Sequence, residues 1–190
     1  MSFIPQAKIT QILTAFLLEQ LPTPPPPLKH VLLAGRSNVG KSSLINALFQ
    51  QKKLAKVSKT PGKTVSVNYY FTDQQTVLID LPGYGYARRS KKEVGQWQYF
   101  LEGFLRQVPP HSELLLLVDS RRGIQKEDLE ALEYFQFFGI KVTILLTKAD
   151  KLNNRARSKL QSTTKVAALL FSTHMPALIQ EVYDTIFTPH

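Results

Sequence analysis

The segment GRSNVGKS, residues Gly35–Ser42, is the most informative stretch of this 190-residue chain. It fits the pattern G-x-x-x-x-G-K-[ST], a glycine-rich loop whose backbone N–H groups wrap the phosphates of a nucleotide. An apolar strand, His30–Ala34, is expected before it, and a helix, Ser42–Gln50, is expected after it. A phosphate loop that joins a strand to a helix predicts a nucleotide-binding α/β domain.

The residue types in this loop have chemical reasons. Gly35 and Gly40 permit backbone angles and a close approach that a Cβ atom would block. Lys41 is expected to reach the β and γ phosphates, and the hydroxyl of Ser42 is expected to bind Mg²⁺. The predicted contacts of the loop with the nucleotide are Gly35, Arg36, Ser37, Asn38, Val39, Gly40, Lys41 and Ser42.

A second motif, DLPG at Asp80–Gly83, follows the apolar strand Thr76–Ile79. At the end of a strand, the carboxylate of Asp80 can hold Mg²⁺ through a water molecule. The N–H of Gly83 can contact the γ-phosphate. The pattern DxxG alone is weakly specific, but its position after a strand and after the phosphate loop makes it informative. Leu81 and Pro82 complete this part of the predicted site.

A third motif, PGKT, ends at Thr64. Its hydroxyl would ligate Mg²⁺ and its N–H would contact the γ-phosphate only in the triphosphate state, so hydrolysis would release residues 56–65. Thr60 is a rival for this role. The predicted contacts of this first switch segment are Gly62, Lys63, Thr64, Val65 and Ser66, and the predicted catalytic residues are Lys41, Thr64 and Gly83.

A fourth motif, TKAD, supplies the choice of base. The carboxylate of Asp150 can accept hydrogen bonds from N1–H and the 2-amino group of guanine, whereas adenine would leave that carboxylate unpaired. Lys148 is expected to lay its stem along the purine plane. A backbone N–H of the turn at 171–173 could contact guanine O6. The four motifs together predict a GTP-binding protein. The remaining predicted base contacts are Thr147, Ala149, Phe171, Ser172 and Thr173.

Apolar strands alternate with amphipathic helices along the chain, which predicts a mostly parallel sheet with helices on both faces. The expected fold is a three-layer P-loop GTPase domain of the α/β class, with six strands, one of them antiparallel. Ligands of such sheets bind beyond the carboxyl ends of the strands, where the motifs lie. The domain is expected over residues 30–187, after an N-terminal helix and proline-rich connector (1–29) and before a short tail (188–190). Its later elements are the strands Val65–Phe71, Thr76–Ile79, Leu114–Val118, Val142–Leu146 and Val166–Phe171, and the helices Lys91–Gln107, Lys126–Phe138 and Pro176–Phe187.

The chain is strongly basic, with 24 Lys and Arg against 14 Asp and Glu, a net charge of +10 and a pI of about 9.8. A bound triphosphate would neutralise only a few of these charges. The remainder favours a polyanionic partner such as RNA, or an anionic membrane surface, although a basic surface can simply serve solubility. Basic residues flank both predicted switch segments and form a third group further on: Lys52, Lys53, Lys56, Lys59, Lys63; Arg88, Arg89, Lys91, Lys92; Arg155, Arg157, Lys159.

Apolar residues recur at helical spacing in the N-terminal segment, from Ile9 to Leu21, before the proline run Pro22–Pro27. This spacing predicts an amphipathic helix that packs on the domain, followed by an extended connector. A helix on a membrane surface is the alternative, but its polar face would carry little positive charge. No apolar run approaches the roughly 18 residues that a membrane span needs. Cysteine is absent, which excludes disulfides and fits a cytoplasmic location.

The chain resembles the EngB/YsxC family of bacterial ribosome-biogenesis GTP-binding proteins. The resemblance rests on GRSNVGKSSLIN, KTPGKT, DLPGYGYA, LTKADKL and the VDSR segment with Asp128 downstream, and covers residues 29–187. It implies a Ras-like GTPase fold, GTP/GDP cycling with Mg²⁺, and a role in large ribosomal subunit assembly with a link to septation. The implied partners are the large-subunit precursor and its rRNA, bound by a monomer. The alternatives are a nucleotide-gated binding module with negligible turnover and a GTPase at a membrane or division site.

Two further residues bear on hydrolysis. Tyr84 directly follows DxxG, where many signalling GTPases have a water-orienting glutamine, so slow intrinsic hydrolysis is expected. Tyr84 and Tyr86 could equally pack the second switch or contact a partner. Asn38 lies three residues before Lys41, and some GTPases with asparagine there hold K⁺ in the space of an arginine finger. A hydrogen-bonding role within the loop is the alternative for Asn38.

Overall fold

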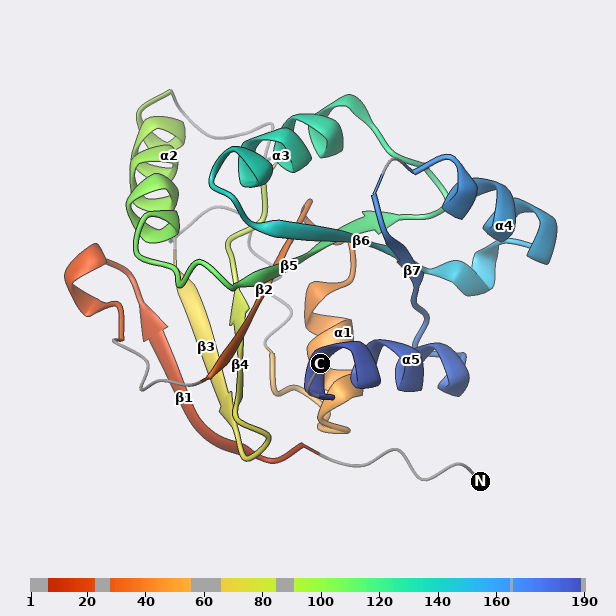
Figure 1. The fold of residues 1–190 in the computed structure, drawn as a ribbon, viewed down its shortest axis with the longest axis horizontal. Helices are drawn as coiled ribbons and strands as arrows, with labels where there is room; N and C mark the ends of the chain where they lie inside the picture. Colours follow the sequence, from red (N-terminus) through yellow and green to blue (C-terminus); the bar gives the residue numbers. More distant parts are fainter. Residues whose placement is uncertain (1–6, 23–27, 56–65, 85–90, 165, 189–190) are drawn as a thin grey trace.

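The computed structural model describes residues 7–22, 28–55, 66–84, 91–164 and 166–188, with the side chains of 91–94 left aside. Seven strands form one sheet in the order β1-β3-β4-β2-β5-β6-β7 within these ranges, and helices cover both of its faces (Figure 1). The strands are β1 (Ile9–Ala15), β2 (Lys29–Gly35), β3 (Val67–Thr72), β4 (Thr76–Asp80), β5 (Glu113–Asp119), β6 (Lys141–Thr147) and β7 (Ala168–Leu170). The helices are α1 (Lys41–Leu48), α2 (Lys91–Leu105), α3 (Lys126–Phe137), α4 (Asn154–Ser162) and α5 (Pro176–Phe187), with short 3₁₀ turns η1 (Leu18–Gln20) and η2 (Ala149–Lys151).

The sheet is parallel except at one strand. β2 pairs in parallel with β4 and β5, and the parallel pairing continues through β6 to β7. β3 runs antiparallel to both of its neighbours, β1 and β4, and forms the predicted hairpin with β4. The predicted α/β fold with one antiparallel strand is therefore confirmed, and the sheet gains a seventh strand at its β1 edge.

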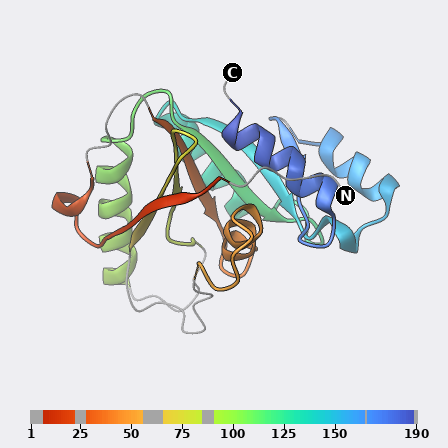
Figure 2. The same ribbon diagram turned by 90° about the horizontal axis from the view of Figure 1, so that it is seen from below.

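Alternate residues of the central strands build two separate cores. Val31 and Leu33 of β2 face α1 and α5, whereas Leu32 and Ala34 face α2 and α3, because successive side chains of a strand point to opposite faces. Figures 1 and 2 show these two helix pairs on opposite sides of the sheet. A strand buried on both faces must be apolar throughout, which is why the central strands could be recognised from their continuous apolar runs.

The prediction of an N-terminal helix is wrong for Ile9–Ala15, which forms strand β1 along β3. Four of its seven residues are β-branched, and β3 would otherwise present an unpaired edge. Leu13 packs on the core between α2 and the sheet, whereas Ile12 is 47% exposed on the other side of the strand. The helical spacing of apolar residues was therefore overridden by pairing with a strand almost 60 residues later.

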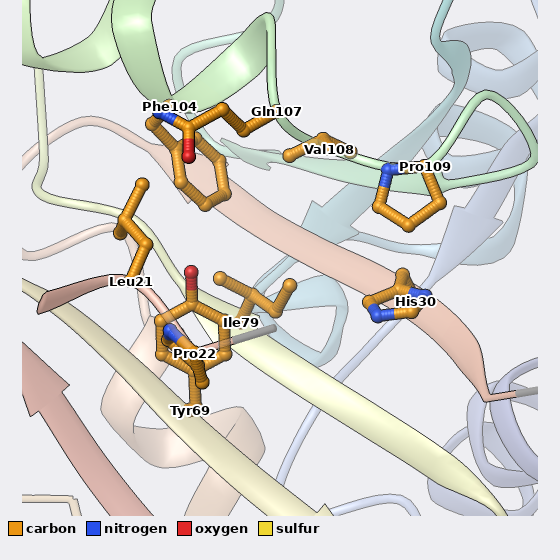
Figure 3. Close-up of a pocket in the computed structure, with 9 residues that line it drawn as sticks. All are labelled: Leu21, Pro22, His30, Tyr69, Ile79, Phe104, Gln107, Val108 and Pro109. Carbon is orange, nitrogen blue, oxygen red and sulfur yellow. The ribbon is translucent and has the colours of Figure 1, made fainter. Parts of the chain in front are cut away.

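After β1 the chain crosses α2 and leaves a cavity of about 310 Å³ beneath it (Figure 3). Leu18 of η1 packs so closely on α2 that a Cβ atom at Gly103 would lie 2.5 Å from its Cδ1. Both ring nitrogens of His30 are buried at one end of the cavity without a hydrogen-bond partner in the described part of the chain. Burial, and then the nearby His111, lower the pKa of His30. The lining residues are Leu21, Pro22, His30, Tyr69, Ile79, Phe104, Gln107, Val108 and Pro109.

The remaining elements agree with the sequence except in one place. α5 begins at Pro176 and ends at Phe187 as predicted, and α3 is followed by Gly139 in the left-handed region, with φ of 73°. α4 was not predicted from the apolar pattern. It is strongly polar, with no buried residue, so its sequence carries little apolar periodicity; its clearest signal is Asn153, whose side chain accepts a hydrogen bond from the N–H of Ala156 as an N-cap.

Candidate nucleotide site

The phosphate loop leaves the carboxyl end of β2 in a conformation that needs its two glycines. A Cβ atom at Gly35 would lie 2.8 Å from Cγ1 of Val39 and 2.9 Å from the carbonyl oxygen of Leu117. Gly40 has φ of +121° and stands immediately before α1. The N–H of Val39 donates to the carbonyl of Arg36 at 3.2 Å, which closes the turn. Because the first N–H groups of a helix have no acceptor within the helix, the start of α1 directly after this loop is a place where a phosphate would be stabilised.

Lys41 and Asp80 face each other across this loop. Nζ of Lys41 lies 3.9 Å from Oδ1 of Asp80, and both side chains are largely buried. Burial raises the pKa of Asp80, and Lys41 and a hydrogen bond with Asn68 only partly oppose that shift. Oδ1 has no hydrogen-bond partner in the described ranges. The pair thus places an anion-binding ammonium beside a carboxylate oxygen that a cation could satisfy.

The DLPG segment contacts the phosphate loop directly. A Cβ atom at Gly83 would lie 3.3 Å from the carbonyl oxygen of Gly35 and 3.5 Å from the backbone nitrogen of Ser37. The next residue, Tyr84, donates its N–H to the carbonyl of Gly35 at 3.4 Å. Leu81 is anchored to β2 through a hydrogen bond from its N–H to the carbonyl of Leu33, at 3.0 Å. The structure therefore brings together the two segments that the sequence assigned to the phosphates.

The side chain of Tyr84 points away from this loop toward α3. Its hydroxyl donates to Oδ1 of Asp128 at 3.0 Å, and Oδ2 of Asp128 accepts from the N–H of Gln125 at 2.9 Å. Burial and the Asp128 carboxylate raise the pKa of Tyr84, so the phenol keeps its proton. Arg36 also turns outward, to Glu127 at 3.2 Å. The phenol of Tyr84 is therefore hydrogen-bonded within the chain, to α3, in this structure.

The carboxyl end of β6 is tied to the same loop. Oγ1 of Thr147 donates to the carbonyl of Val39 at 2.7 Å. Lys148 has a left-handed backbone, with φ of 58°, and its Nζ donates to the carbonyl of Asn38 at 3.1 Å. The same ammonium lies 2.7 Å from Oδ2 of Asp119. Hydrogen bonds thereby tie the TKAD motif to the phosphate loop.

Asp150 is set for an acceptor role. The hydroxyl of Ser172 donates to its Oδ1 at 2.6 Å, and Nζ of Lys151 lies 3.2 Å from Oδ2. The hydrogen bond from Ser172 is the main reason that the pKa of Asp150 is lowered, so the group is ionised at neutral pH. The N–H of Ala149 donates to the carbonyl of Phe171 at 3.1 Å, which joins the TKAD motif to the turn after β7. Thr173 is exposed beside them.

Sequence reasoning missed two contributions to this site. Asp119, at the end of β5, is bound by Arg121 and Lys148, whose hydrogen bonds hold the pKa of its carboxyl well below the usual range. Its signal was the same as that of Asp80: a carboxylate directly after a buried apolar strand. Ser172 was expected to offer a backbone N–H, but its side chain positions Asp150. The predicted contacts Gly62, Lys63, Thr64 and Val65, and the rival Thr60, lie outside the described residues.

Comparison with known proteins agrees with this geometry. Residues 30–148 match the family model described as 50S ribosome-binding GTPase. The chain is 49% identical over 149 residues to the probable GTP-binding protein EngB of Desulfovibrio desulfuricans, which covers 78% of this chain and 73% of that relative. It is 41% identical over 137 residues to the probable GTP-binding protein EngB of Aquifex aeolicus, covering 72% and 74% of the two chains.

The fold is also found among solved structures. A crystal structure of a probable GTP-binding protein engB superposes with a TM-score of 0.65 at 24% identity, covering 83% of this chain and 96% of that one. Era, crystallised with MgGDPNP and a segment of 16S ribosomal RNA, superposes with a TM-score of 0.57 at 18% identity, covering 86% of this chain and 57% of that one. From the family model and the curated relatives together, the chain belongs to the EngB family of GTP-binding proteins and is a GTPase.

Proposed function

We propose that this GTPase acts as a nucleotide-controlled switch in the assembly of the large ribosomal subunit, as a cytoplasmic monomer. The observation that carries the proposal is the contact between the DLPG segment and the phosphate loop, where a Cβ atom at Gly83 would lie 3.3 Å from the carbonyl oxygen of Gly35. A γ-phosphate in the loop would meet the N–H of Gly83. Tyr84 would then transmit the change to α3 through Asp128.

The residues at the phosphate end suit Mg²⁺. The buried oxygen Oδ1 of Asp80, without a hydrogen-bond partner in the described ranges, is the hard donor that this ion prefers. Ser42, Thr64 and Asp80, the last through water, would hold the ion. When bound, Mg²⁺ neutralises charge on the β and γ phosphates. Lys41 would bind the same phosphates, and its charge partly offsets the rise that burial causes in the pKa of Asp80. Gly83 would position the γ-phosphate by its N–H.

Hydrolysis is expected to be slow for two reasons. The hydroxyl of Tyr84 is hydrogen-bonded to Asp128, and no glutamine follows DxxG to orient the attacking water. K⁺ at Asn38 would supply the missing charge. Asn38 is exposed with φ of 61°, and its backbone carbonyl accepts a hydrogen bond from Lys148, so a cation held here would be bound by the side-chain oxygen. Hydrolysis should be faster in K⁺ than in equimolar Na⁺, and Asn38→Ala should remove that difference while GDP affinity holds. Equal rates in both salts, with and without ribosomal particles, would exclude the ion.

The base is tested separately from the phosphates. Asp150 should accept two hydrogen bonds from guanine, so Asp150→Asn should weaken GTP and GDP binding and favour xanthine nucleotides, whose C2 carbonyl suits an amide donor. Competition between unlabelled nucleotides measures this preference. Equal affinity of the unmodified protein for ATP and GTP would contradict the whole proposal.

The large-subunit precursor and its rRNA fit the charge of the chain, +10 over 190 residues. The test is co-sedimentation of the protein with purified large-subunit particles, loaded with a non-hydrolysable GTP analogue or with GDP. Retention in the GTP form and release in the GDP form are expected. Depletion in cells should accumulate incomplete large subunits, and a septation defect should follow. Equal binding to both subunits in every nucleotide state would refute the assembly role.

Two alternatives remain distinguishable. A binding module with negligible turnover would release no phosphate above background, even with large-subunit particles present. A GTPase at a membrane or division site was expected to use an N-terminal helix, but that segment is strand β1 in the sheet. In the described residues no helix is long and apolar enough to cross a membrane. Co-sedimentation of the protein with liposomes would support the membrane alternative.

A further inference from the structure

A second cavity of about 310 Å³ lies between α2 and α3, under the DLPG segment. Its volume is at the low end of the ~300–1,000 Å³ range of ligand pockets. Most of its wall is apolar or aromatic, and it belongs neither to the phosphate loop nor to the base-reading turn. The lining residues are Ala34, Leu81, Pro82, Tyr84, Trp97, Gln98, Leu101, Glu127, Glu130, Ala131, Tyr134 and Phe135.

Within the described part of the chain, the charged residues that line this cavity are opposite in sign to the chain as a whole. Its charged lining residues are Glu127 and Glu130, both on α3, in a chain with a net charge of +10. Glu130 is exposed and pairs only loosely with Lys126, at 3.5 Å on the same helix, an arrangement that contributes little. The indole N–H of Trp97 is buried without an acceptor among the described residues. The cavity thus offers an apolar interior and, at its edge, the carboxylate of Glu130 as an acceptor for a cation.

The walls of the cavity are also parts of the nucleotide site. Leu81 and Pro82 belong to the DLPG motif, and Tyr84 follows it. Glu127 is tied to Arg36 of the phosphate loop at 3.2 Å, and the hydroxyl of Tyr84 to Asp128 of α3 at 3.0 Å. A movement of Gly83 with the γ-phosphate would therefore shift its neighbours Pro82 and Tyr84 in the cavity wall, and would couple occupancy of the cavity to the nucleotide state.

We propose that the cavity between α2 and α3 binds a cationic segment of a partner protein, which inserts an apolar side chain and places Lys or Arg against Glu130. Phosphate groups would be repelled by this carboxylate, so RNA would bind elsewhere, on the basic surface. The nucleotide dependence of this docking rests on the proposed switch function. The cavity would thus bind a protein component of an assembling particle, while the basic surface would bind its RNA.

The chain contains its own reporter for this site, because Trp97 is its single tryptophan. The full-length protein, loaded with GDP or with a non-hydrolysable GTP analogue, is titrated with a tryptophan-free peptide of alternating Arg and Leu. A matched peptide of alternating Glu and Leu and a single-stranded RNA of twelve uridines (U12) are titrated in parallel. Only the cationic peptide should change the Trp97 emission saturably, with affinities that differ between the two nucleotide states by about fivefold or more.

Two residues of α3 form a matched pair of variants. Glu130→Lys should weaken the cationic peptide by about tenfold or more, because it reverses a charge at the cavity. Glu133→Lys, an exposed change of the same kind that does not line the cavity, should leave the affinity within about twofold. Ala131→Phe fills the cavity and should abolish the emission change. Thermal melts and GDP binding verify that each variant is folded.

The docking site, its preference for a cationic peptide and its coupling to the nucleotide can each be refuted by a different result. Equal peptide affinity in Glu130→Lys and Glu133→Lys, or an equal response to the Glu/Leu peptide, would refute the cationic docking site. Quenching by U12 RNA in competition with the peptide would assign the surface to RNA instead. Identical peptide affinity in the two nucleotide states would refute the coupling. Each of these results leaves guanine specificity and large-subunit binding to be judged by their own experiments.

Discussion

Asp80 carries a conflict between stability and function. Its pKa is raised in the folded chain chiefly by burial, so the folded state holds the proton more tightly than the unfolded state. The charged group therefore costs folding free energy as pH rises above the ordinary Asp value of about 3.9. Asp80→Asn should raise the Tm of the nucleotide-free protein by about 2–4 °C, the shift expected for ~1 kcal/mol in a domain of this size. It should also lose Mg²⁺-dependent GTP binding.

Calorimetry in EDTA, followed by nucleotide titration with Mg²⁺, measures both effects. The matched control is Asp73→Asn, an exposed carboxylate at the tip of the β3–β4 turn. A lower Tm for Asp80→Asn than for this control would contradict the argument from burial.

His30 should make the chain sensitive to mild acid. Its pKa is lowered in the folded state, so the unfolded chain binds the proton more tightly and stability falls as pH drops below the ordinary value of about 6.5. The stability is complete above that pH. His30→Phe should remove most of this slope between pH 7 and 5 and raise the Tm at pH 5.5.

Urea denaturation at a series of pH values measures the slope. His111→Gln is the control, because it removes the neighbouring imidazole, whose centroid lies 6.0 Å away, and leaves His30 buried. A slope that follows His111 and not His30 would show that the wrong imidazole has been identified.

The motif residues were predictable because their chemistry is local. Gly35, Lys41 and Asp80 follow from spacing and from the ends of apolar strands, without knowledge of the fold. Asp119 and the side chain of Ser172 were not, because their partners Lys148 and Asp150 reach them only through folding. Residues that bind the ligand leave a pattern in the sequence, whereas residues that position them leave only a polar side chain at a strand end or turn.

At the scale of elements, β1 shows why periodicity alone can mislead. Its apolar residues suit either a helical stripe or the two sides of a strand, and the choice depends on the free edge of β3. The central strands β2, β5 and β6 posed no such ambiguity, since burial on both faces makes them continuously apolar. The apolar pattern did not indicate α4 for the opposite reason: this helix has no buried residue, so no apolar stripe marks an inner face.

Neighbouring residues of β1 offer a test of this assignment. A helix would place Ile12 and Leu13 on one apolar stripe, but the strand points them to opposite sides. Leu13→Lys should destabilise the protein by about 1–3 kcal/mol, because it forces a charge against the core. Ile12→Lys, at a side chain 47% exposed, should change stability by no more than about 0.5 kcal/mol. Similar losses in urea denaturation of both variants would favour the helix.

At the scale of the whole molecule, the charge should govern association with the particle. Affinity for large-subunit particles should fall linearly in a log–log plot against salt, with a slope of about −0.7 to −0.9 for each phosphate neutralised. Replacing Arg88, Arg89, Lys91 and Lys92 by Ala should flatten this slope and leave GDP affinity nearly intact. Replacing Arg155 and Lys159 of α4 provides the comparison, and an unchanged slope in the first variant would remove that cluster from the interface.

The pairing of β1 with β3 has a consequence for synthesis of the chain. About 60 residues separate Ile12 from its partner Tyr70, so at ~5–20 residues per second β1 leaves the ribosome roughly 3–12 s before the strand that it needs. During that interval Ile9 and Leu13 have no sheet to cover them. The nascent chain therefore presents an unpaired apolar strand to chaperones until translation has passed β3.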